Sequence, residues 1–107
     1  GYILLDLASV EPTTGEPQCF IVDLGVERSD WGRGVAHRLC NAACRVTVAR
    51  GLTYLVGVVS SHNRRALDIA LGDLEFHIER HQIMRRCGPA DLAREFTADE
   101  KRDIKVE

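Results

Sequence analysis

Long hydrophobic runs, paired cysteines and lysine are the features that this sequence has least of. No apolar stretch approaches the roughly 20 residues that a membrane-spanning helix needs, so we expect no membrane partner. The four cysteines form no C-x-x-C pair and match no zinc spacing, so we expect no bound metal. With no signal peptide visible, reduced thiols in a cytoplasmic protein are the simplest expectation.

An excess of charge of one sign is also missing. The formal net charge is −2, which argues against a nucleic-acid partner. Acidic and basic side chains balance over residues 1–87, where every basic residue is Arg, and the only lysines are Lys101 and Lys105. Hydrophobic residues make up 45% of the 107 residues, which fits one small globular domain with a modest core.

The first half of the chain predicts a hairpin and a helix. Apolar runs at 2–8 and 19–26, joined by a turn-rich segment at 9–17, predict two antiparallel strands. The helix then begins after Gly34, and Gly51 ends it. Its core-facing stripe is predicted from apolar spacings of three and four, at Val35, Leu39, Ala42, Val46 and Ala49.

The second half predicts a strand, a helix and another strand. The continuous apolar run at 53–59 predicts a buried strand, parallel to the one before the helix. Asn63 is a candidate N-cap for a helix that carries apolar residues from Leu67 to Leu74. The segment 76–84 predicts a weaker strand. The order β-β-α-β-α-β makes this an α/β fold with a mixed sheet, in a domain at 1–87 followed by a polar tail at 88–107.

The segment between the hairpin and the first helix carries the chemistry. Residues 26–36 read V-E-R-S-D-W-G-R-G-V-A, so a strand runs out, a glycine-containing turn follows and a helix starts at once. The first N–H groups of a helix lack intrahelical partners and favour anions. Gly32 and Gly34 let a phosphate approach the backbone, and Arg33 adds charge-assisted hydrogen bonds. This pattern predicts a cradle for a pyrophosphate.

Two common nucleotide motifs are not met by this turn. The dinucleotide fingerprint G-x-G-x-x-G fails because His37 stands where the third glycine belongs, and no G-K-S or G-K-T completes a P-loop. A generic nucleotide-binding α/β domain stays open as an alternative.

The run V-E-R-S-D-W-G-R-G-V-A-H-R-L resembles the acyl-CoA-binding motif of the GNAT acetyltransferase superfamily, which has the form Q/R-x-x-G-x-G/A. Gly34 and Ala36 match its last two defined positions, whereas Trp31 stands where Gln or Arg is usual. Downstream, Asn63 and Ala66 match the N-x-x-A that opens the family's next helix. Leu74-Glu75-Phe76 is similar to the family's L-G-F, with Glu75 in place of Gly.

The resemblance implies an N-acetyltransferase that transfers an acetyl group from acetyl-CoA to a primary amine by direct attack. The acceptor, a small-molecule or protein amine, is left unidentified. Only the family's C-terminal, coenzyme-binding portion is matched, because its N-terminal strand and helices have no counterpart here. Three explanations remain open: this chain is a piece of a longer one, a partner chain supplies the missing elements, or the protein is a reduced relative of the family. A non-catalytic module that binds coenzyme A or a partner chain also remains open. The unpaired edge of the first strand favours a homodimer.

The resemblance places acetyl-CoA where the second hairpin strand splays from the next parallel strand. Arg33 to Ala36 would hold the pyrophosphate through their amides, and Trp31 would either cover the coenzyme or pack on the hairpin. Asn63 would either bind pantetheine or only cap its helix. The residues that the resemblance assigns to the coenzyme are Leu24, Val26, Trp31, Gly32, Arg33, Gly34, Val35, Ala36, Asn63 and Ala66.

Direct attack needs a base for the ammonium proton and an acid for the thiolate. By resemblance, the acid would be a tyrosine on the second helix, but Ala70 occupies that position. Asp23 and Glu27 are the candidate bases, with Asp6 across the hairpin as a third. The sequence H-I-E-R-H at His77 only mimics a metal motif, because the H-E-x-x-H motif needs Glu directly after its first His.

Overall fold

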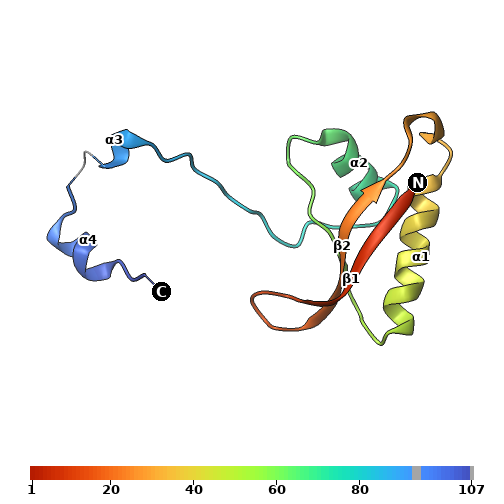
Figure 1. Cartoon of the computed structure of the whole chain (residues 1–107), viewed down its shortest axis with the longest axis horizontal. Coiled ribbons are helices and arrows are strands. Elements are labelled where there is room, and N and C mark those ends of the chain that lie inside the picture. Colours follow the sequence, from red (N-terminus) through yellow and green to blue (C-terminus); the bar gives the residue numbers. More distant parts are fainter. Residues whose placement is uncertain (93–94, 107) are drawn as a thin grey trace.

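The computed structural model describes residues 1–92 and 95–106 (Figure 1). Strands β1 (Tyr2–Val10) and β2 (Pro17–Gly25) form the predicted antiparallel hairpin. In the turn between them, the Glu11 carboxylate accepts hydrogen bonds from the amides of Thr13, at 2.8 Å, and Thr14, at 2.6 Å. The two register shifts along the hairpin lie at Leu4/Leu5 and between Asp6 and Ser9.

Helix α1 (Val35–Ala49) packs on all three strands. It follows the short 3-10 helix η1 (Arg28–Asp30), and it ends as predicted, with Gly51 at a φ of 72°. The predicted core stripe is wrong in part, because Cys40, Ala43 and Thr47 are the buried residues while Val46 is 37% exposed. Thr47 is buried without penalty since its hydroxyl donates to the Ala43 carbonyl at 2.8 Å.

Strand β3 (Leu55–Val56) completes a three-stranded sheet in the order β1-β2-β3. It pairs parallel to β2, as the crossover predicts, but it is much shorter than the predicted strand at 53–59. Helix α2 (Arg64–Gly72) begins at the predicted N-cap. In Figure 1, α1 and α2 lie on opposite sides of the hairpin. Because β1 and β2 pair antiparallel and β2 and β3 pair parallel, the α/β class with a mixed sheet is confirmed.

The predicted last strand at 76–84 is wrong. The chain there is extended but irregular and runs away from the sheet (Figure 1). A strand needs a neighbour to complete its ladder of hydrogen bonds, and no strand among the described residues lies beside this segment. Ile83 and Met84 are therefore 91% and 85% exposed.

Two short helices complete the described part of the chain. Helix α3 (Pro89–Leu92) and helix α4 (Ala98–Asp103) lie beyond the extended segment (Figure 1). Thr97 caps α4, because its hydroxyl accepts a hydrogen bond from the Glu100 amide at 3.2 Å. The radius of gyration is 19.2 Å, against about 13 Å for a compact chain of this length. The domain boundary at residue 87 stays a prediction.

Candidate functional site

The pairing between the two parallel strands ends well before β2 does. Strand β2 pairs with β3 only at Cys19↔Leu55 and Phe20↔Val56, yet β2 continues to Gly25. Over residues 21–25, β2 keeps β1 on one side and has no paired strand on the other within the described chain. The carboxyl ends of parallel strands are where open α/β sheets bind ligands. The unpaired part of β2 lies where the resemblance implies a splay between the two strands.

The start of α1 lies directly after β2 and offers free donors. Gly34 is the N-cap residue with a φ of 76°, and no side chain caps the helix. The Arg33 amide is used inside the turn, where it donates to the Asp30 carbonyl at 3.2 Å. Within residues 1–92, no acceptor is bonded to the amides of Gly34, Val35 and Ala36. Three of the four predicted amides can therefore meet an anion, and Arg33 can contribute through its side chain.

The space in front of this turn is open. A Cβ added at Gly32 would meet nothing within 4 Å, and one at Gly34 would meet only Nη1 of Arg38, at 3.6 Å. Arg38 itself donates to the Arg33 carbonyl at 3.0 Å, which holds the turn in shape. The glycines are therefore required by their positive φ angles, 79° at Gly32 and 76° at Gly34, and leave room for a ligand.

Trp31 joins this turn to the start of α2. Its indole N–H donates to the Val26 carbonyl at 3.1 Å, which ties the loop to the end of β2. The guanidinium carbon of Arg65 lies 4.2 Å from the ring centroid, and that of Arg28 lies 5.4 Å from it. Both are within cation–π range. The indole thus packs against the hairpin end, as one of its two predicted roles required, and stays 44% exposed.

Asn63 caps α2 in the way that the sequence predicts. Its Oδ1 accepts from the Ala66 amide at 3.2 Å, and its own amide donates to the Ser60 carbonyl at 2.9 Å. The side-chain NH2 group remains available as a donor. Because Arg65 contacts Trp31, the start of α2 lies beside the turn that precedes α1.

The three candidate bases have different surroundings. The Tyr2 hydroxyl donates to Oδ2 of Asp23 at 2.5 Å. This hydrogen bond, together with the negative charge of Asp23, raises the pKa of Tyr2 above its usual value. Asp6 accepts from the Ala8 amide at 2.9 Å and so supports the irregular part of its own strand. Glu27 is exposed and precedes η1 without a capping bond from its side chain.

The Tyr2–Asp23 pair is the feature that the sequence reasoning missed. Tyr2 lies opposite Gly25 in the hairpin register, so Asp23 is its diagonal neighbour on the same face. The alternation of the two strands is the signal that could have found the pair, once the register was known.

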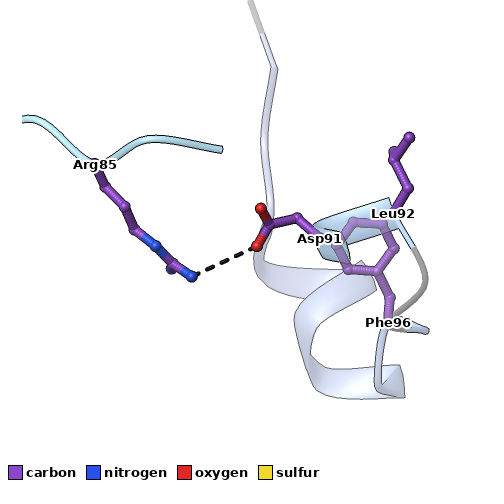
Figure 2. Close-up of a pocket in the computed structure, with 4 residues that line it drawn as sticks. All are labelled: Arg85, Asp91, Leu92 and Phe96. Carbon is purple, nitrogen blue, oxygen red and sulfur yellow. Dashed lines mark hydrogen bonds and ion pairs between the residues drawn. The ribbon is translucent and has the colours of Figure 1, made fainter. Parts of the chain in front are cut away.

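Two cavities lie away from this surface. One, of about 390 Å³, is lined by Arg85, Asp91, Leu92 and Phe96 (Figure 2). Arg85 and Asp91 form an ion pair across it at 3.5 Å, and none of its lining residues was predicted for a site. A second, also of about 390 Å³, lies on α1 between Cys44 and Ala49. The candidate site is instead an open surface between two helix starts.

Among residues 1–92 and 95–106, no three His, Cys, Asp or Glu side chains gather as a metal site would require. None of the helices described there combines the length and the apolar character that crossing a membrane demands.

Two of three comparisons with known proteins found a match. A model of the acetyltransferase (GNAT) family matches residues 1–72. Among solved structures, the chain is similar to AAC(6')-Iy in complex with the bisubstrate analog CoA-S-monomethyl-acetylneamine, with a TM-score of 0.65 and 22% identity over 80% of this chain. The chain spans 58% of that protein's chain. A search of curated proteins found no match.

The matched residues include every part of the site described above. The unpaired part of β2, the turn at Gly34 and the cap at Asn63 all lie within residues 1–72, which form more than half of the chain. Family match, fold and local geometry converge, and the chain belongs to the acetyltransferase (GNAT) family.

Proposed function

We propose that this chain binds acetyl-CoA between β2 and β3 and transfers its acetyl group to a primary amine. The observation that carries the proposal is the end of pairing between the two parallel strands after Phe20 and Val56, beside three unbonded amides at the start of α1. An anion placed there meets both the amides and the positive end of the helix dipole.

The residues at the turn would hold the diphosphate. Gly34, Val35 and Ala36 donate their amides, and the exposed Arg33 side chain adds charge-assisted hydrogen bonds. Within the described residues, neither Leu24, near the end of β2, nor Val26, directly after it, has a strand partner on the β3 side, so the Leu24 backbone and the Val26 amide suit pantetheine. The Val26 carbonyl is already bonded to Trp31, which leaves the indole beside the coenzyme. Asn63 and the first turn of α2, with Ala66, flank the same space.

Asp23 would take the proton from the ammonium group of the acceptor. The bound coenzyme supplies a thioester, in which the acetyl group is activated. The neutral amine forms a C–N bond to the acetyl carbon, the C–S bond breaks, and the second nitrogen proton passes through solvent to the leaving sulfur. Water is the proton source because Ala70, on α2, has no acidic side chain. Glu27 is the second candidate for the base.

The proposal leaves the acceptor open between small-molecule and protein amines. The bisubstrate analog bound to AAC(6')-Iy joins CoA to acetylneamine, which favours a small amine. The four cysteines are unpaired, which supports a reducing compartment such as the cytoplasm.

One observation favours a second function. Ala70 removes the acid that the resemblance implies, so a module that binds coenzyme A without turnover is the alternative. Titration calorimetry with coenzyme A and with acetyl-CoA separates the two, when it is combined with mass spectrometry of amines incubated with acetyl-CoA. We expect both coenzymes to bind, ATP not to displace them, and acetylated amine to form. Binding without product supports the module, and absence of binding rejects both.

A further inference from the structure

We propose that Tyr2 positions Asp23 to receive the ammonium group of the acceptor, so that the two residues form the amine subsite of the enzyme. This inference rests on the acetyl transfer proposed above. It assigns a role to Tyr2, a β1 residue outside the coenzyme-binding segments.

The contact between the two residues is short and directional. The Tyr2 hydroxyl lies 2.5 Å from Oδ2 of Asp23. A phenol carries its proton at neutral pH, so Tyr2 donates and Asp23 accepts, and this bond raises the pKa of Tyr2 further. This bond engages one carboxylate oxygen. No described residue bonds to the other oxygen, Oδ1, which is therefore free for an incoming ammonium group.

Gly25 makes this arrangement possible. A Cβ at residue 25 would lie 2.5 Å from Cε1 and 2.8 Å from Cζ of the Tyr2 ring, so the ring fits only over a bare α-carbon. Glycine weakens a strand interior and often marks a close approach by another group. Here the approaching group is the phenol ring, and its position over Gly25 directs the hydroxyl toward Asp23.

The charge and location of Asp23 fit an amine subsite. Asp23 forms no ion pair with any residue in the described part of the chain, so its negative charge is not neutralised by a neighbour. It precedes Leu24, at the part of β2 that has no partner on the β3 side. An alkylammonium group at Asp23 would therefore be held close to the proposed position of the thioester.

The test compares two tyrosines of similar exposure in the full chain. Tyr2 is 54% exposed and Tyr54 is 57% exposed, but only Tyr2 makes a hydroxyl hydrogen bond within the described residues. Acetyl transfer is measured to butylamine, which is protonated at neutral pH as lysine is, and to hydroxylamine, which is already neutral. Coenzyme A binding to each variant is measured by calorimetry.

We expect Tyr2→Phe to lower kcat/KM for butylamine about tenfold, since a hydrogen bond to a charged group is lost. Asp23→Asn should lower it about 100-fold, the scale of general-base catalysis. Both variants should keep coenzyme A binding and most of their activity with hydroxylamine, while Tyr54→Phe should match the wild type. An absorbance titration of tyrosinate should show a lower pKa for Tyr2 in Asp23→Asn.

The outcomes separate the two proposals. If no coenzyme A binds to the wild type, the proposed function itself fails. If coenzyme A binds but butylamine is not acetylated, or if Tyr2→Phe behaves as Tyr54→Phe does, the amine subsite is rejected and the coenzyme site stands. An equal loss with butylamine and hydroxylamine also rejects it, because a neutral nucleophile does not need the base.

Discussion

At the scale of single residues, the site depends on backbone freedom more than on charge. Gly34 holds a φ of 76° at the point where the chain turns from β2 into α1. The same residue lends one of the three unbonded amides, so its conformation and its donor act together. Trp31 and Arg38 then keep the turn in place from either end.

Replacing Gly34 by alanine should cost both stability and coenzyme binding. A left-handed conformation costs an L-residue about 1–2 kcal/mol, so we expect Gly34→Ala to lower the free energy of unfolding by about that amount in urea titrations. Calorimetry should also show weaker binding of coenzyme A, because the new methyl group faces the open side of the turn. Gly88→Ala is the control, since Gly88 has no positive φ and no neighbour within 4 Å. Equal behaviour of the two variants would contradict this explanation.

At the scale of elements, the hairpin turn is organised by one carboxylate. Burial alone would raise the pKa of Glu11, but hydrogen bonds from the amides of Thr14 and Thr13 and from the Arg80 guanidinium lower it to about 2. The ion pair with Arg80 also fastens the start of the extended segment to the hairpin. The Glu11 side chain is only 18% exposed as a result.

The hairpin should therefore weaken in acid. Because the pKa of Glu11 is lower in the folded state than its usual 4.5, its contribution to stability is complete above about pH 4.5 and is lost as the pH falls toward 2. Urea unfolding measured across this pH window should show that the free energy of unfolding falls less steeply with pH for Glu11→Gln than for the wild type. Glu16→Gln, in the same turn, should keep the wild-type dependence. Identical curves for all three proteins would show that Glu11 does not hold the turn.

The elements that the sequence predicted well are those set by local signals. The turn predicted within 9–17, the start of α1 after Gly34 and its end at Gly51 all depend on residues next to one another in the chain. The predicted strand at 76–84 was wrong. Alternating apolar and polar residues form a strand only when a neighbouring strand pairs with them, and β3 is too short to do so. Glu75 shows a backbone detail that the sequence did not reveal. Its φ of 61° lies in the left-handed region, which explains why the family pattern has glycine there.

The candidate site also has parts that local sequence signals predict and a part that they do not. The amides at Gly34 and the cap at Asn63 follow from helix starts, which the sequence marks. The pair formed by Tyr2 and Asp23 depends on the register of the hairpin, which two irregularities alter. No pattern within either strand encodes that register.

At the scale of the whole molecule, much apolar surface is uncovered. Within the described residues, strand β1 pairs with β2 alone, and Tyr2, Leu4 and Val10 are each more than half exposed. The largest fully buried side chain is Cys19, so the core is small. An edge strand of this kind pairs readily with another chain.

We therefore expect two copies to associate through the outer edge of β1. Light scattering should show a mass that rises with concentration toward twice 11.9 kDa. Val10→Lys should weaken association, because a lysine on an edge strand opposes pairing. Val48→Lys, at a position 74% exposed on α1, should leave it unchanged. A constant monomer mass, or a loss confined to Val48→Lys, would contradict association through this edge.

The contact of Trp31 with Arg65 and Val26 has a practical consequence. The chain has a single tryptophan, and it lies where β2 ends and where α1 and α2 begin. Indole fluorescence is sensitive to nearby charges, so its emission should shift when a polyanionic ligand enters beside it. The protein thus carries its own optical probe, and occupancy can be followed in real time without any label.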